Sequence, residues 1–106
     1  MVERADVYLV NLDPAVGAEI KKTRPALVVS PAEMNRHLST VIVAPMTTRR
    51  HGYPTRIRCS LAGKTGEVVL DQIRTVDRAR LVRRIGRLRQ PTMDRVLAGL
   101  REMFEP

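Results

Sequence analysis

Two polar segments of the chain carry side chains suited to binding a phosphate group. Residues 13–25 form a long polar excursion between two apolar runs, and Arg24 stands near its end, directly before Pro25. The second segment is the polar stretch 47–50, which follows a third apolar run. Long loops on small rigid scaffolds often hold binding sites, and a guanidinium pairs with phosphate through two hydrogen bonds. The two loops are therefore the first candidates for a functional site.

The two histidines, His37 and His51, are suited to proton transfer near neutral pH. One could deprotonate a ribose hydroxyl while the other protonates a leaving oxygen, which is ribonuclease chemistry. Both lie in expected loops, where a solvated histidine is the commoner outcome, so their roles stay open. Cys59 lies on the apolar side of an alternating segment, which favours a buried structural thiol over a nucleophile.

The motifs of several other enzyme classes are absent. The chain has no glycine-rich phosphate loop, no His-Glu-x-x-His or Cys-x-x-Cys motif and no nucleophile elbow. A single cysteine rules out an internal disulfide, and with only two histidines it also rules out a Cys/His zinc site. We expect neither a metal nor a cofactor.

The chain is short and strongly basic. Its 106 residues suffice for one domain, spanning 1–106, and a hydrophobic content of 43% indicates a globular protein. The net charge is +8, and 16 of the 19 basic residues are arginine. A polyanionic partner follows, with nucleic acid ahead of a membrane surface, although an arginine-rich genome would produce the same bias. No segment resembles a signal peptide or a membrane span, so we expect a cytoplasmic protein.

Short strands must position the two polar loops. The expected strands, apolar or alternating and mostly bounded by turn residues, are 6–12, 26–30, 40–46, 55–61, 67–70, 73–77 and 84–88. Asp77 is well placed to cap a short helical turn over residues 78–81. Six or seven mostly sequential strands predict a small, strongly bent antiparallel barrel or half-barrel.

The C-terminal segment has the periodicity of a helix that begins near Pro91 or Thr92. Its apolar stripe consists of Met93, Val96, Leu97, Leu100, Met103 and Phe104, with Arg95, Gly99, Arg101 and Glu102 expected off the stripe. The stripe favours a helix that covers one end of the sheet over a helix that binds a partner. Open edges in so small a sheet also favour a homodimer.

Motifs along nearly the whole chain resemble the MazF/PemK-type toxins, the ribonuclease components of bacterial toxin–antitoxin pairs. They are Asp6-Val7-Tyr8, Leu12-Asp13-Pro14, Gly17-Ala18-Glu19, Lys22-Thr23-Arg24-Pro25, Asn35, residues 42–47, residues 71–77 and residues 85–88. The resemblance implies a mainly β fold with a C-terminal helix, an SH3-like antiparallel barrel of the PemK/CcdB-like plasmid maintenance toxin type. It also implies a homodimer and metal-independent cleavage of single-stranded RNA.

The resemblance carries the family's catalytic arginine onto Arg24 and its catalytic threonine onto Thr47. The proton acceptor stays open among Glu19, His51 and a bound water. Lys21, Lys22, Thr48, Arg49 and Arg50 flank the catalytic pair and are expected to line the RNA path. Ala5 departs from the glycine that many members have, and residues 51–64 follow no strong family pattern. The chain has only three aromatic residues, so we expect base selection to rest mainly on hydrogen bonds.

The expected function is therefore a sequence-specific endoribonuclease toxin that cuts messenger RNA, blocks translation and is neutralised by an acidic, MazE-like antitoxin. Two alternatives stay open. One is a non-enzymatic toxin of the same barrel family that poisons a topoisomerase through its C-terminal helix, and the other is a catalytically inactive RNA-binding module. Purely structural roles are also open, with Arg24 in a salt bridge to Glu19 and Thr47 as a strand-end cap.

Overall fold

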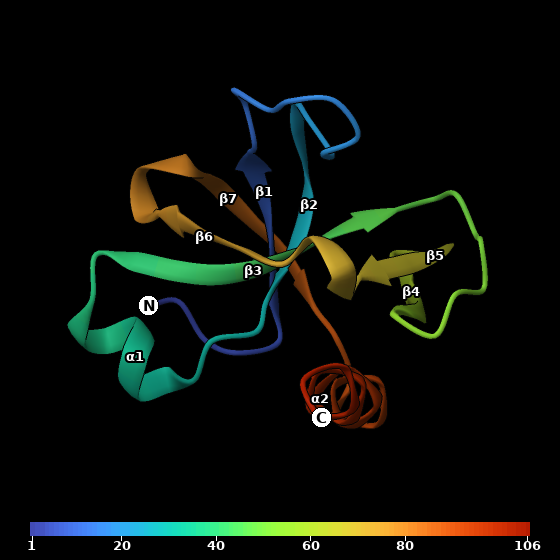
Figure 1. Ribbon diagram of the computed structural model, residues 1–106. Coiled ribbons are helices and arrows are strands. Elements are labelled where there is room, and N and C mark those ends of the chain that lie inside the picture. Colours follow the sequence, from blue (N-terminus) through green and yellow to red (C-terminus); the bar gives the residue numbers. More distant parts are fainter.

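Seven strands form one curled antiparallel sheet, and two α-helices lie outside it (Figure 1). The computed structural model describes residues 1–106. The elements are β1 (Asp6–Asn11), β2 (Thr23–Val28), α1 (Ala32–His37), β3 (Thr40–Thr47), β4 (Arg56–Leu61), β5 (Lys64–Val69), β6 (Arg74–Asp77), β7 (Leu81–Arg87) and α2 (Gln90–Met103), with 3-10 turns η1 (Leu70–Gln72) and η2 (Arg78–Arg80). The predicted mainly β half-barrel with a C-terminal helix is confirmed.

The long strand β3 joins the two halves of the sheet. The strand order is β4-β5-β3-β2-β1-β7, and β6 pairs with the first half of β3 while β5 pairs with its end. The sheet therefore bends around β3, and the loops that leave the ends of β1 and β3 come to the same side. Residues 12–22 and 48–55 form these two loops.

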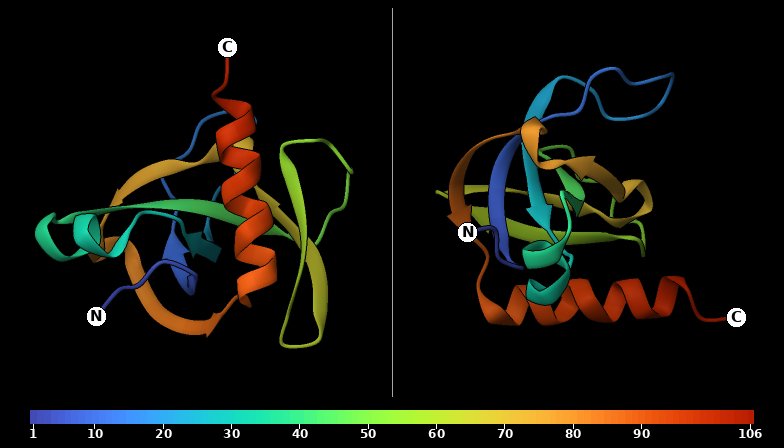
Figure 2. Two further views of the ribbon diagram at one scale, coloured as in Figure 1. Left: turned by 90° about the horizontal axis from the view of Figure 1, so that it is seen from below. Right: turned by 90° about the vertical axis from the view of Figure 1, so that its left-hand side faces the viewer.

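Helix α2 lies across one end of the curled sheet, as predicted (Figure 2). Its buried residues Met93 and Val96 pack in a core cluster that also contains Val7 and Leu27. The expectation that Gly99 lies off the packed stripe is wrong, because a Cβ at this position would come within 2.8 Å of the Leu70 side chain. Glycine here allows α2 to approach the sheet closely. Neither α-helix is long and apolar enough to span a membrane.

Several expected boundaries shift in the structure. Strand β2 begins at Thr23 rather than residue 26, because its pairing with β1 continues to Asn11 and Thr23. Strand β5 begins at Lys64, since a tight turn at Ala62 and Gly63 starts the hairpin three residues early. The short turn after Asp77 is confirmed, with the Asp77 carboxylate accepting a hydrogen bond from the Ala79 amide.

One helix was not predicted. Residues 32–37 form α1, so the expectation that His37 lies in a loop is wrong. The helix is short and mostly exposed, and its one buried residue is Asn35, which bonds to Ser30. So short a polar segment has no apolar stripe from which a helix could be predicted.

Candidate active site

Arg24 and Thr47 lie at the ends of neighbouring strands and line the same hollow. The pairing of β2 with β3 sets Ala26 opposite Pro45, and the same register continued by two residues sets Arg24 opposite Thr47. The pairing ends at this point because Pro25 has no amide hydrogen to donate. Arg24 and Thr47 are therefore not joined by the β2–β3 pairing, and both line one hollow.

The terminal nitrogens of Arg24 have no protein partner. Its Nε donates a hydrogen bond to the carbonyl oxygen of Lys21 at 3.3 Å, which fixes the stem of the side chain. The ion pairs of the structure involve other arginines, so the alternative of an Arg24–Glu19 salt bridge is wrong. The Glu19 carboxylate instead accepts a hydrogen bond from the amide of Val16 at 2.8 Å. The outer edge of the guanidinium is thus open to an anion.

The Thr47 hydroxyl has a structural bond and a free hydrogen. Its Oγ1 accepts a hydrogen bond from the amide of Arg49 at 3.2 Å, so the residue does cap the end of β3. A hydroxyl that accepts through its oxygen can still donate its hydrogen. The capping bond therefore orients Thr47 and leaves it able to donate toward the hollow.

The hollow between the two loops has a volume of about 370 Å³ and contains most of the expected site residues. Its lining is Gly17, Ala18, Glu19, Ile20, Lys21, Arg24, Thr47, Thr48 and Arg49. Lys22 is not part of the lining, because its main chain, at a φ of +70°, is bonded to Leu12 and Asp13. Arg50 lines a neighbouring hollow instead. The two histidines are not brought together, since His37 ends α1 and His51 lies in the β3–β4 loop.

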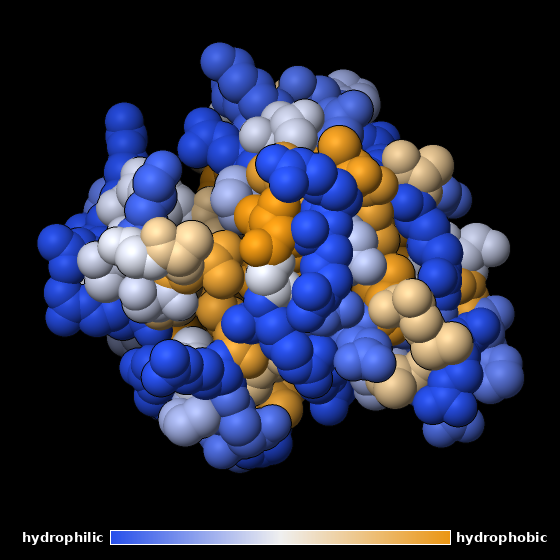
Figure 3. Space-filling model, turned by 180° about the vertical axis from the view of Figure 1, so that it is seen from behind, coloured by the Kyte–Doolittle hydropathy of each residue, from blue (hydrophilic) through white to orange (hydrophobic).

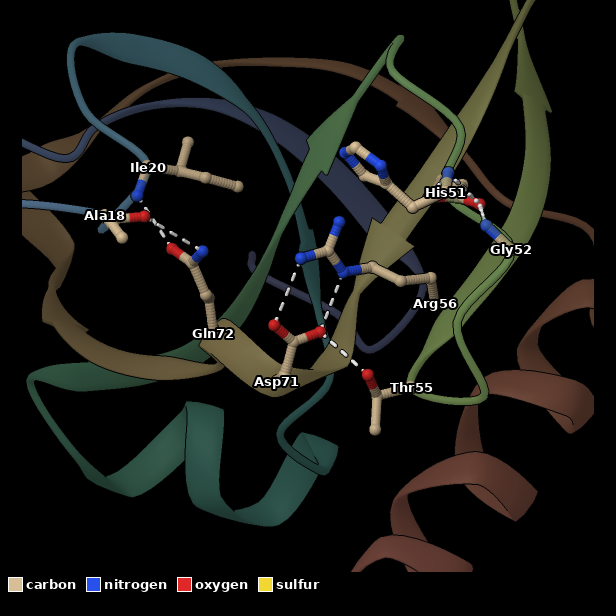
Figure 4. A network of polar contacts seen from close by, with 9 residues as sticks. Ala18, Ile20, His51, Gly52, Thr55, Arg56, Asp71 and Gln72 are labelled. Atoms are coloured by element: carbon tan, nitrogen blue, oxygen red, sulfur yellow. Dashed lines mark hydrogen bonds and ion pairs between the residues drawn. The ribbon is translucent and has the colours of Figure 1, made fainter.

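Gln72 attaches the β1–β2 loop to the sheet. Its Oε1 accepts a hydrogen bond from the Ile20 amide at 2.7 Å, and its Nε2 donates to the Ala18 carbonyl at 3.3 Å (Figure 4). These are bonds to the main chain on both sides of Glu19. The loop that carries Glu19 and Lys21 is therefore held beside Arg24 by a residue more than fifty positions away.

Glu67 holds the first part of the β3–β4 loop in the same way. Its side chain is buried at 3% exposure, and its carboxylate accepts hydrogen bonds from the amides of His51, at 3.1 Å, and Gly52, at 2.9 Å. Burial by itself would raise the pKa of Glu67, but the two amide bonds and the nearby Arg56 outweigh it and lower the pKa below its usual value. Glu67 is therefore charged and fully used in holding the loop.

Asp71 holds the second part of that loop. Its carboxylate accepts hydrogen bonds from Arg56 Nε at 2.8 Å and from the Thr55 hydroxyl at 2.9 Å. The hydrogen bond from Arg56 is the main reason why the pKa of Asp71 is lowered. Sequence reasoning missed Glu67, Asp71 and Gln72 as site-supporting residues. The available signal was a carboxylate directly before the apolar run 68–70, where an unpartnered charge would be costly.

Replacing Glu67 by glutamine should destabilise the protein at neutral pH by about 1–3 kcal/mol, because buried amides lose part of their acceptor. A lowered carboxylate pKa stabilises the folded state above the unfolded pKa, and that contribution disappears as the pH falls through the folded value. The difference in the free energy of unfolding between wild type and Glu67→Gln, measured by urea unfolding, should therefore be smaller at pH 3 than at pH 7. An equal gap at both pH values would contradict this assignment, and the exposed Glu105→Gln is the control.

The fold and the hollow together define a small half-barrel protein with an arginine and a threonine hydroxyl in the lining of one polar hollow. Residues 3–104 match the family described as PemK-like, MazF-like toxin of type II toxin-antitoxin system. The chain belongs to this family.

Individual relatives agree with the family match. The chain is 37% identical over 105 residues to the Endoribonuclease PemK of Escherichia coli, covering 93% of this chain and 79% of that protein. A crystal structure of MazF (Form-I) from Deinococcus radiodurans superposes with a TM-score of 0.85 at 28% identity, covering 96% of this chain and 94% of that one. An endoribonuclease in complex with its cognate antitoxin from Mycobacterial species superposes with a TM-score of 0.82 at 27% identity, covering 96% and 93%.

Proposed function

We propose that this protein is a sequence-specific endoribonuclease toxin that cuts single-stranded messenger RNA in the cytoplasm without a metal ion. The observation that carries the proposal is the pair formed by Arg24 and Thr47, two side chains suited to a phosphate that line one hollow and have unused donors. The names of the curated relatives, which are endoribonucleases, support the same activity.

The reaction is a transesterification within the RNA. The ribose 2′-oxygen loses its proton and forms a bond to the adjacent phosphorus, while the bond from phosphorus to the 5′-oxygen breaks and that oxygen takes up a proton. The products are a 2′,3′-cyclic phosphate and a 5′-hydroxyl. Negative charge accumulates on the phosphoryl oxygens, where Arg24 and Thr47 would donate hydrogen bonds, each worth roughly 3–4 kcal/mol in the transition state.

The proton acceptor must be a group other than arginine, whose pKa lies above about 12. Glu19 lines the hollow and is exposed, which makes its carboxylate the first candidate for the proton acceptor. Lys21, Thr48 and Arg49 line the same hollow and would hold the flanking phosphates. Lys22 and Arg50 lie outside this hollow and would contact the RNA only beyond the rim of the hollow.

Two protein partners belong to the proposal. The first is a second copy of the chain, supported by the apolar patches that lie between hydrophilic side chains on the face behind that of Figure 1 (Figure 3). The second is an acidic antitoxin, supported by the net charge of +8 and by the relative that was solved with its cognate antitoxin. An acidic segment lying over the arginine-rich rim would block the hollow.

Incubating the purified protein with long mixed-sequence RNA in excess EDTA tests the activity directly. We expect discrete fragments that carry 5′-hydroxyl ends. Fragments only after addition of a divalent metal would contradict the metal-independent mechanism. Bound but intact RNA would favour the inactive RNA-binding module, and inhibition of a topoisomerase with no effect on RNA would favour the poison.

A further inference from the structure

A second hollow lies at the β3–β4 loop. Its lining begins at Arg50, directly after Arg49 of the first hollow. The second hollow has a volume of about 530 Å³ and is lined by Arg50, His51, Gly52, Arg56, Arg58 and Glu67. We propose that this hollow binds one further nucleotide of the RNA strand, with the base stacked on the aromatic pair His51–Tyr53 and its phosphate held by Arg50 and Arg58. The inference rests on the proposed function, because it adds a subsite to the same substrate.

The sheet register connects this hollow to the candidate catalytic pair. Glu67 of β5 is paired with Thr47 of β3 on one side and with Arg58 of β4 on the other. Residues directly opposite each other in an antiparallel sheet extend their side chains from the same face. A strand of RNA that reaches Thr47 can therefore continue over β5 to Arg58 without passing around an edge of the sheet.

Two arginines at the second hollow have no partner within the protein. The side chains of Arg50 and Arg58 are exposed and make no hydrogen bond or ion pair within the protein. Arg56 is paired with Asp71, and the carboxylate of Glu67 is taken up by main-chain amides. Two free guanidinium groups therefore face a hollow whose acidic groups are already satisfied, which suits a phosphate.

An aromatic stack stands at the rim. The rings of His51 and Tyr53 are nearly parallel, at 9°, with centroids 5.2 Å apart, and the Arg56 guanidinium carbon lies 5.3 Å from the Tyr53 centroid. Tyr53 is 53% exposed although it is one of the few large apolar side chains in the loops. Every base has a π-face, so such a pair can accept a base without selecting its identity by hydrogen bonds. Base stacking therefore adds to the affinity for RNA, whereas base selection is still expected to rest on hydrogen bonds.

The stack is held in place before any ligand arrives. Glu67 fixes the main chain of His51 and Gly52, and Asp71 fixes Thr55 and Arg56 on the other side of Tyr53 (Figure 4). Binding to a loop that is already ordered avoids the entropic cost of ordering it.

The test uses a 2′-O-methyl oligonucleotide, which cannot be cleaved, with the fluorescent base 2-aminopurine at successive positions. Stacking quenches this base. We expect quenching at one position with the wild type, and its loss together with roughly fivefold to hundredfold weaker binding in Tyr53→Ala. Tyr53→Phe should restore both. Arg58→Ala should weaken binding and reduce the slope of log affinity against log salt by about 0.7, whereas the exposed helix variant Arg101→Ala should change neither.

Cleavage of ordinary RNA by the wild type is measured in parallel. If the wild type cleaves RNA but Tyr53→Ala and Arg58→Ala bind as tightly as the wild type, the subsite is overturned and the proposed function stands. If the wild type neither cleaves nor binds RNA, the subsite and the proposed function are both overturned. Unchanged RNA binding with lost binding of a polyglutamate peptide would assign this surface to a protein partner and would also overturn the subsite.

Discussion

Arg24→Ala should lower the rate of RNA cleavage by about 10²–10³-fold, because one charged donor to the phosphoryl oxygens is lost in the transition state. Thr47→Ala should cause a loss of similar order, since its hydroxyl is the second donor at the rim of the hollow. The measurement is single-turnover cleavage of a labelled RNA, with enzyme in excess.

The stability of these variants shows whether slower cleavage comes from a lost catalytic group or from unfolding. The Arg24 side chain is exposed and forms one hydrogen bond, so Arg24→Ala should unfold at nearly the wild-type urea concentration. Arg101→Ala removes an equally exposed arginine from α2 and should cleave normally. Wild-type cleavage by Arg24→Ala would rule out the assigned site.

Gly66→Ala should displace the end of β3, which carries Thr47. A Cβ at Gly66 would lie 2.2 Å from the carbonyl oxygen of Thr47 and 3.1 Å from its carbonyl carbon. These are main-chain atoms, so the end of β3 must shift and carry the Thr47 hydroxyl with it. We expect about 100-fold slower cleavage from a displacement of this kind, together with about 1–3 kcal/mol of lost stability, as measured by cleavage kinetics and urea unfolding.

Gly63→Ala provides the matched control. Gly63 has a φ of +79° in the β4–β5 turn, and a Cβ there would meet no atom within 4 Å. Alanine is strained at this φ, so Gly63→Ala should lose roughly 1–2 kcal/mol of stability without moving Thr47. Cleavage that falls equally in both variants would show that stability, and not the position of Thr47, governs the loss.

The strands and the candidate pair could be predicted because their signals are local. Alternating or apolar runs predicted every strand. Arg24 and Thr47 lie in the polar segments that flank two of those runs, and the resemblance to the MazF/PemK-type toxins singled them out as a pair. The register of β2 and β3 then brings the two residues to one rim. Exact strand ends could not be predicted, since Thr23 is in a strand only because Asn11 lies opposite it.

The supporting contacts could not be predicted because they join distant residues, and those of Glu67 and Gln72 do so through the main chain. The Gln72 side chain bonds to Ala18 and Ile20, which lie 54 and 52 positions away. An amide group of the main chain is the same in every residue, so the sequence of the loop carries no sign of the contact. The hollow around Arg58 was missed for a similar reason, since it depends on the pairing of β4 with β5.

The attachment of the two loops has a consequence for how the protein could be redesigned. Glu67 and Gln72 hold the loops through four main-chain groups, those of Ala18, Ile20, His51 and Gly52. Such anchors do not depend on which side chains the loops carry. Libraries that randomise exposed loop positions outside the candidate site, with Glu67, Asp71 and Gln72 kept, should therefore yield folded variants whose RNA fragment patterns can be compared.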